Sequence, residues 1–358
     1  MGLAANLTSH AVGEMFARDP MGAPIYVVVV KATFSFAGGG ALQPIAPQPI
    51  LERDVYAGDP ATSGLLRAAE LGLPKPRVDV LLAGALKFKA PMTESIARLE
   101  VGRRIDKRVA LFGDRHWLPG VVSELSPSRV QPVMELPIAW ERTAGGGDLE
   151  NPGLTDRRNP AGCTAARTAP ALHGKPLPNF ETPLEPTPPT AWKSRPAPIG
   201  LGAVAGHWEP RSGFAGTYDA RWKEQRAPLL PEDFDPAFFN CAPADQQLAG
   251  YMPGEEVRLT GMTASGYVRV SLPELVVPVT FVLRDVIEER RARVDTVVIE
   301  PAEERLSVVA RATCTPRPAM TAVREAFVGP LTRGRRKALE LGKPFLDLRS
   351  LPRPKGPA

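Results

Sequence analysis

Alternating apolar and polar side chains mark short strands along most of the chain. Residues 25–30 form a continuous apolar run, and residues 31–36 then alternate polar and apolar side chains, as in a strand that passes from full to partial burial. The same criteria predict further strands over residues 78–88, 96–101, 108–112, 133–140, 257–259, 267–272, 276–283, 294–299 and 306–313. Residues 301–304 separate the last two and predict a hairpin loop. Many short strands with turn signals favour a mainly β fold with a sandwich-like or barrel-like body.

Helical spacing is confined to two places. Asp59 and Pro60 are residue types that begin a helix, and Gly72 is a type that ends one, so a short helix is predicted between them. Residues 319–341 place apolar side chains at helical intervals, but a Gly-Pro pair at residues 329–330 interrupts them. The C-terminal tail is therefore expected to hold two short helices.

Proline is the unusual feature of the composition. The chain has 358 residues and 40 prolines, which nearly excludes a long helical bundle because proline disrupts helix interiors. Nine of these prolines fall within residues 170–198. That stretch could be a flexible linker between two β lobes. Phe180, Trp192 and the aromatic-rich residues 208–239 favour instead an ordered segment that wraps around the β body.

These features predict one β-rich domain over residues 20–315, followed by a tail. The domain is expected to divide into an N-terminal lobe, residues 20–144, a proline-rich segment, residues 145–200, and a C-terminal lobe, residues 201–315. The tail, residues 316–358, carries ten Lys or Arg residues against three acids, in a chain whose net charge is +5. The rest of the chain is therefore slightly acidic.

The basic tail is a candidate for partner binding. Clustered positive charge can attract nucleic acid, lipid or an acidic protein, and it can also be the solvated face of a helix. The candidate contacts are Arg324, Arg335 and Arg336. We expect an appendage that can be removed without unfolding the β body.

Sequence motifs for enzymatic chemistry are absent. No phosphate-binding loop, dinucleotide-binding glycine motif, nucleophile elbow or zinc-protease motif occurs. The three glycines at residues 145–147 precede no predicted helix, so they are expected to form a mobile loop rather than a phosphate site. The three cysteines and four histidines are scattered, which predicts no disulfide framework, no metal site and no cofactor.

The same features bear on location. No apolar run reaches the roughly 18 residues that a membrane helix needs. The N-terminus lacks the basic start and apolar block of a secretory signal, and unpaired cysteines suit a reducing compartment. We expect a cytoplasmic protein without a membrane partner.

One acidic cluster offers a catalytic alternative. Glu232, Asp233 and Asp235 lie close together in the sequence, and with His207 they could form the acid–base set of a hydrolase. The same residue types also begin turns and helices, and Phe234 interrupts the spacing of a cation-binding loop. We expect structural roles for these acids.

A longer motif points to a family. Residues 206–235 begin Gly-His-Trp-Glu-Pro-Arg and end Pro-Leu-Leu-Pro-Glu-Asp-Phe-Asp. Shorter blocks accompany this motif at residues 29–34, 75–80, 113–117, 150–152, 159–162, 177–179, 238–240 and 245–247. Over roughly residues 20–313, the sequence resembles a bacterial family of type VI secretion accessory proteins that is catalogued as a domain of unknown function.

The resemblance implies a non-enzymatic adaptor chaperone. Such a protein binds a secreted effector, or the PAAR-tipped VgrG spike, in the cytoplasm and helps to load the effector onto the spike. The expected partner is therefore a protein rather than nucleic acid. Aromatic residues are favoured at interfaces, so the candidate contacts are Trp208, Tyr218, Trp222 and Phe238, although each could equally belong to the core.

Overall fold

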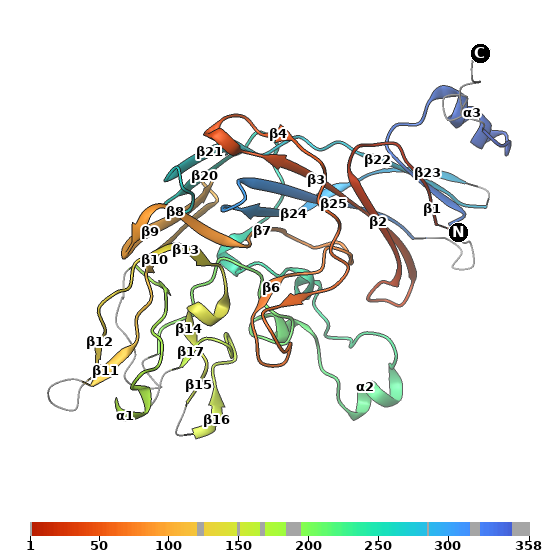
Figure 1. Ribbon diagram of the computed structural model, residues 1–358. Coiled ribbons are helices and arrows are strands. Elements are labelled where there is room, and N and C mark those ends of the chain that lie inside the picture. The colour runs from red at the N-terminus through yellow and green to blue at the C-terminus, as the bar shows by residue number, and fades with distance from the viewer. Residues whose placement is uncertain are drawn as a thin grey trace, which may run out of the picture.

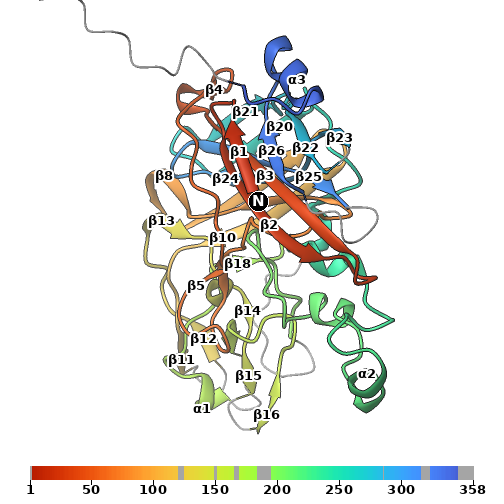
Figure 2. The same ribbon diagram turned by 90° about the vertical axis from the view of Figure 1, so that its right-hand side faces the viewer.

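The body of the protein is built from three β-sheets of seven, five and four strands (Figures 1 and 2). The computed structural model describes residues 2–119, 125–148, 151–164, 169–183, 195–284, 286–315 and 323–345. Its α-helices are short, namely α1 (Ala169–Leu172), α2 (Ala220–Gln225) and α3 (Arg333–Glu340). The predicted mainly β fold is therefore confirmed.

The seven-stranded sheet is the framework of the molecule. Its strands run in the order β19-β7-β24-β25-β3-β2, and β4 pairs with the end of β3. The strands are β2 (Ala11–Arg18), β3 (Pro24–Ser35), β4 (Gln43–Pro44), β7 (Val78–Leu82), β19 (Gln247–Leu248), β24 (Arg293–Glu300) and β25 (Arg305–Cys314). β3 contains the predicted apolar run, and β24 and β25 form the predicted hairpin.

Two smaller sheets pack side by side on one face of this framework. The five-stranded sheet has the order β18 (Phe180–Glu181), β10 (Ile105–Phe112), β9 (Glu94–Val101), β20 (Glu256–Thr260) and β21 (Tyr267–Ser271). The four-stranded sheet has the order β1 (Gly2–Asn6), β26 (Glu325–Val328), β22 (Pro278–Val282) and β23 (Ile287–Arg291). The remaining strands described form two-stranded sheets. These pair β5 (Val55–Tyr56) with β6 (Leu65–Arg67), β8 (Ala85–Met92) with β13 (Val133–Pro137), β11 (Trp117–Pro119) with β12 (Leu125–Pro127), β14 (Ala144–Gly145) with β17 (Cys163–Thr164), and β15 (Gly147–Asp148) with β16 (Asn151–Thr155).

One face of β3 packs in two apolar cores, one under each of the smaller sheets. On β3, Val28 and Val30 belong to the apolar cluster under the four-stranded sheet, and Ala32 belongs to the cluster under the five-stranded sheet. Residues two apart in a strand point to the same face, so these three side chains line a single surface. β25 continues both cores, because Ala310 lies opposite Val30 and Val308 opposite Ala32.

The two expected lobes do not form separate units. Strands from residues 20–144 pair with strands from residues 201–315 at four places, which are β7 with β19, β7 with β24, β9 with β20, and β3 with β25. Each large sheet therefore needs both halves of the chain. The predicted division into lobes is wrong because sequence spacing carries no information about pairing between distant strands.

The opposite face of the seven-stranded sheet is also buried, and it combines apolar side chains with charged pairs. Lys31 on β3 pairs with Glu70 at 2.7 Å, and Arg311 on β25 pairs with Asp295 on β24. All four side chains are less than a tenth exposed. The chain between β4 and β7 covers this face with apolar side chains and also supplies Glu70.

The helix predicted after Asp59 does not form. Asp59 closes a turn, and the chain then extends into β6. Gly64 donates its amide hydrogen to Glu141 Oε1 at 2.6 Å, and Leu65 is buried in an apolar cluster. These tertiary contacts outweigh the small helix propensity of the segment.

Glycines correct two other predictions. Gly84 has a φ of 79° and divides the strand predicted over residues 78–88 into β7 and β8. The glycines at residues 145–147 pack against the body instead of forming a mobile loop. A Cβ atom on Gly145 would lie 2.3 Å from the carbonyl oxygen of the buried Asn159.

The first helix expected in the tail is a strand. β26 is an inner strand, hydrogen-bonded to β1 on one side and β22 on the other. Val323, Ala326 and Val328 are buried in the core beneath the four-stranded sheet. Residues 323–328 are therefore part of the fold, which argues against the expectation that residues 316–358 can be removed without unfolding the β body. Only the second predicted helix, α3, is present.

The described part of the proline-rich segment packs on the body. Leu172, Leu177 and Phe180 are buried, and β18 joins the edge of the five-stranded sheet beside β10. These contacts hold residues 171–181 against the rest of the protein. Trp192, expected to anchor the same segment, lies outside the described residues.

Candidate protein-binding site

The acids proposed for catalysis have local structural roles. Asp233 accepts hydrogen bonds from the amide and hydroxyl of Thr217 at 2.9 and 2.7 Å, which lower the pKa of its carboxyl. Asp235 caps the turn at residues 236–239, and Glu232 is exposed. In the described part of the chain, no hydrogen bond or ion pair joins His207 to these acids. Asp235 therefore begins a turn, as the sequence predicts, and Asp233 holds the segment at Thr217.

The cysteines are poorly suited to nucleophilic chemistry. All three are buried free thiols. Burial raises the pKa of Cys163 to about 12 and the pKa values of Cys241 and Cys314 to about 11, so the reactive thiolate is scarce at neutral pH. Among the described residues, no group of His, Cys, Asp and Glu side chains gathers in a way that could hold a metal ion.

Motif residues from distant segments meet in a buried polar cluster. Asp79 on β7 is fully buried and accepts hydrogen bonds from Lys75 Nζ at 2.7 Å and from Asn240 Nδ2 and the Cys241 amide at 2.9 Å. Burial raises the pKa of Asp79, but Lys75 and these hydrogen bonds outweigh it and hold the pKa below its ordinary value. The cluster joins residues 75–80 to residues 240–241, which is a structural role.

The aromatic candidates divide between core and surface. Trp208 is 1% exposed and belongs to an apolar cluster, so it is a core residue and cannot present its ring to a partner. Tyr218 is 53% exposed, and its ring packs edge-on against Trp222 of α2 at 4.7 Å between centroids. Phe238 is half-buried between two other phenylalanine rings. Figure 1 shows α2 projecting from the body.

The helix α3 is held at one end of the molecule beside the four-stranded sheet (Figure 1). Thr332 caps its N-terminus by accepting an amide hydrogen from the first turn. Gly342, with a φ of 63°, ends the helix, and the amides of residues 342 and 343 bond back to the last turn, as in a Schellman motif. The chain then returns along the helix, where Phe345 lies against Gly334.

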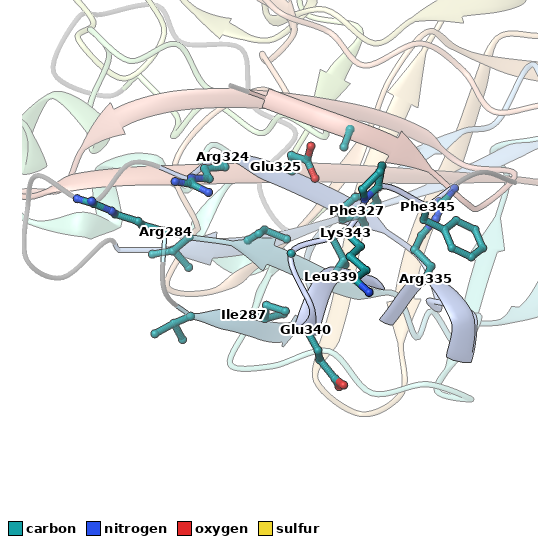
Figure 3. Close-up of a pocket in the computed structure, with 16 residues that line it drawn as sticks. Arg284, Ile287, Arg324, Glu325, Phe327, Arg335, Leu339, Glu340, Lys343 and Phe345 are labelled. Atoms are coloured by element: carbon teal, nitrogen blue, oxygen red, sulfur yellow. The ribbon is translucent and has the colours of Figure 1, made fainter. Parts of the chain in front are cut away.

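A groove of about 690 Å³ lies between α3 and the four-stranded sheet (Figure 3). We refer to it as the α3 groove. Its apolar lining comes from Val282, Ile287, Phe327, Leu339 and Phe345. Its volume falls in the range of about 300–1,000 Å³ that is typical of ligand-binding pockets.

Basic side chains surround this apolar lining. Figure 3 shows Arg284 and Arg324 towards one end, and Arg335 and Lys343 towards the other. Within the described residues, none of these four side chains forms an ion pair. Two acids, Glu325 and Glu340, also line the groove. Because four basic side chains outnumber these two acids, the net charge of the groove is positive.

Arg335 is the most constrained of these cations. Its guanidinium lies 5.6 Å from the ring centroid of Phe327 and 5.2 Å from that of Phe345. Its Nη1 atom is shielded from solvent and has no hydrogen-bond partner, which is an unfavourable state for a charged donor. Arg336, the third basic candidate, instead pairs with Glu289 at 2.7 Å and does not line the groove.

A second groove, of about 640 Å³, lies at the other end of the β22–β23 hairpin. Ile287 pairs with Val282 beside the α3 groove, whereas Arg291 pairs with Pro278 beside the second groove. Arg291 and Arg293 are both exposed and line it. The hairpin thus separates two basic grooves.

Sequence reasoning found only part of the α3 groove. Arg324 and Arg335 were predicted from the basic tail, but Arg284 and Phe345 were not. Arg284 follows β22, and only the pairing of β22 with β26 brings it beside Arg324. No local pattern could have shown this, because it depends on contacts between distant strands.

Comparison with known proteins identifies the family. No helix in the described ranges is both long and apolar enough to cross a membrane. No curated protein and no solved structure matches the chain. Residues 21–311 match the family model described as "Uncharacterized protein conserved in bacteria (DUF2169)", which ends before β26 and α3. Because the match covers most of the chain and all of the motif blocks, the protein belongs to this bacterial family.

Proposed function

We propose that the protein is a non-enzymatic adaptor, which binds a type VI secretion effector or the PAAR-tipped VgrG spike in the cytoplasm and helps to load the effector. The observation that supports this most is the α3 groove, where four cations without ion pairs surround an apolar lining. Apolar surface rimmed by polar groups is typical of a site that another molecule covers.

The sheet edge beside the groove favours recognition through side chains. β23 is one of the two edge strands of the four-stranded sheet, and four of its five residues are charged. Charged side chains on an edge discourage the addition of another strand. A partner that approaches this end of the molecule is therefore expected to insert side chains into the α3 groove rather than extend the sheet.

The chemistry of the proposed catalytic residues also favours an adaptor. Asp233 and Asp235 satisfy local backbone groups, and His207 lies beside Tyr56 and Trp208 with ring centroids 6.5 and 6.0 Å away. A hydrolase would need the acids and the histidine to converge on one substrate atom. Nothing in their contacts draws them together.

Affinity purification of the full-length protein from its native bacterium tests the proposal. An effector or a VgrG–PAAR spike protein should copurify, and deletion of the adaptor gene should abolish secretion of that effector. A strain that carries the gene on a plasmid provides the control, because it should restore secretion. Normal secretion without the gene, or the absence of any secretion protein among the copurified proteins, would contradict the proposal.

A further inference from the structure

We infer that the α3 groove takes an acidic and apolar segment of the partner protein, in which an Asp or Glu carboxylate binds Arg335. This inference rests on the proposed adaptor function and specifies the chemistry of the partner. It assigns the anchoring contact to Arg335, with Arg324 and Arg284 available for a second acid at the far end of the groove.

The surroundings of Arg335 are suited to a carboxylate. The rings of Phe327 and Phe345 flank the guanidinium and limit its movement, which lowers the entropic cost of binding. Its Nη1 donor has no partner in the described structure. A carboxylate can accept two parallel hydrogen bonds from a guanidinium, so a carboxylate that reaches Arg335 from the groove would give this donor a partner.

The rest of the groove defines the neighbours of that carboxylate. Ile287 and Phe345 are each 37% exposed, and both line the groove. These apolar surfaces require apolar side chains in the partner next to its acid. Basic side chains at both ends of the groove favour a segment with acids on either side of its apolar residues.

Other occupants fit less well. The chain's own residues 346–358 carry three basic residues and one acid, so their charge matches that of the groove instead of opposing it. A nucleic acid would place phosphates near the acidic lining residues Glu325 and Glu340, and it would bury little of the aliphatic lining. A segment of a protein that combines acidic and apolar residues matches both features.

Selection from a random-peptide phage library tests the inference directly. The bait is the full-length protein, as wild type, Arg335→Gln and Arg336→Gln. The Arg336 variant loses the same charge from the same helix, but outside the groove. Wild type and Arg336→Gln should enrich peptides in which Asp or Glu adjoins Leu, Ile or Phe, whereas Arg335→Gln should not.

An enriched peptide, made synthetically, then gives the size of the contact. Replacing its acid by the amide should weaken binding about tenfold or more, as expected for a hydrogen-bonded charge. Arg335→Lys should not restore binding, because lysine lacks the planar pair of donors. The comparison of the acid and amide peptides uses the wild-type protein, so it remains valid if Arg335→Gln unfolds. A thermal unfolding curve would reveal such unfolding.

Several results would overturn the inference. These are enrichment of peptides without acids, equal enrichment by Arg335→Gln, full rescue by Arg335→Lys, and no enrichment at all. Peptide binding that appears only after residues 346–358 are removed would make the chain's own tail the occupant. If the wild-type protein forms dimers and Arg335→Gln dissociates them, the occupant of the groove would be a second copy of the chain. If RNA displaces the peptide at physiological salt, the occupant would be a nucleic acid.

The inference and the adaptor proposal can fail separately. If an effector copurifies equally with wild type and Arg335→Gln, the adaptor proposal stands and the assignment of the α3 groove is wrong. If an acidic peptide binds through Arg335 but no secretion protein copurifies, the groove binds as inferred and the adaptor proposal is wrong.

Discussion

A buried ion pair joins the seven-stranded sheet to the chain segment that covers it. Lys31 Nζ lies 2.7 Å from Glu70 Oε1, and Glu70 also accepts the amide hydrogen of Leu51 at 3.0 Å. Removing one partner of such a pair leaves an uncompensated buried charge, which is far more costly than losing an exposed pair. The pair therefore joins β3 to its cover.

We predict that Glu70→Ala lowers the free energy of unfolding by about 3–5 kcal/mol, because Lys31 would keep a buried charge without a partner. Urea unfolding measures this. Glu289→Ala is the control, since Glu289 is exposed and its pair with Arg336 should contribute about 0–1 kcal/mol. If the two substitutions lower the free energy of unfolding equally, the buried pair does not stabilise the protein as we describe.

Asp79 should make stability depend on acid pH. Its native pKa lies below the ordinary value of 3.8, despite the opposing effect of burial, because Lys75, the side-chain amide of Asn240 and the backbone amide of Cys241 stabilise the carboxylate. The unfolded state then binds more protons in acid, so the stabilisation is complete above about pH 5 and is lost as the pH falls towards the native pKa.

We therefore expect Asp79→Asn to reduce the slope of unfolding free energy against pH between about pH 5 and pH 3. At pH 7 it should also destabilise the protein, because Lys75 keeps a buried charge. Asp106→Asn should cost only about 0–1 kcal/mol at pH 7, since Asp106 is 49% exposed. Urea unfolding at several pH values would contradict the account if the slopes of wild type and Asp79→Asn coincide.

At the scale of elements, β26 and α3 differ in what they support. β26 fills the middle of the four-stranded sheet and buries Ala326 and Val328, whereas α3 has no fully buried residue and forms one wall of the α3 groove. We therefore expect the strand to be needed for folding and the helix to be needed for the groove.

Two truncations separate these roles. Deletion of residues 331–358 should leave cooperative unfolding intact but abolish binding of partner or acidic peptide. Deletion of residues 316–358 should unfold at least the four-stranded sheet, because it exposes the core beneath β22. Circular dichroism and limited proteolysis measure both outcomes. A stable protein after the longer deletion would show that β26 is dispensable.

Local sequence patterns predicted the individual strands better than they predicted which strands pair with one another. The apolar run in β3 and the hairpin of β24 and β25 depend on neighbouring residues, and both are present. Residues 326–328 have apolar side chains that fit a helix or a strand, and only their pairing with β1 and β22 selects the strand. Leu65 shows the same limit, because its burial depends on a distant apolar cluster.

At the scale of the whole molecule, the candidate site lies at one end of a rigid β framework. Figure 1 shows α3 and the four-stranded sheet at that end, with the five-stranded sheet and the shorter strand pairs β11–β12 and β15–β16 away from it. The sheet side of the groove belongs to this frame, and a binding surface on a regular element is positioned more precisely than one on a loop. The sequence predicted the β frame and the basic tail, but not the groove between them.

Photo-crosslinking in the native bacterium tests the central claim most directly, namely that the α3 groove binds a secretion partner. A photoreactive amino acid at Ile287, which is 37% exposed in the groove, should form an adduct with an effector or spike protein. The same group at Ile96, which is 50% exposed on β9 of the five-stranded sheet, should not. Adducts of equal yield at both positions, or an adduct with that partner at Ile96 alone, would contradict the account.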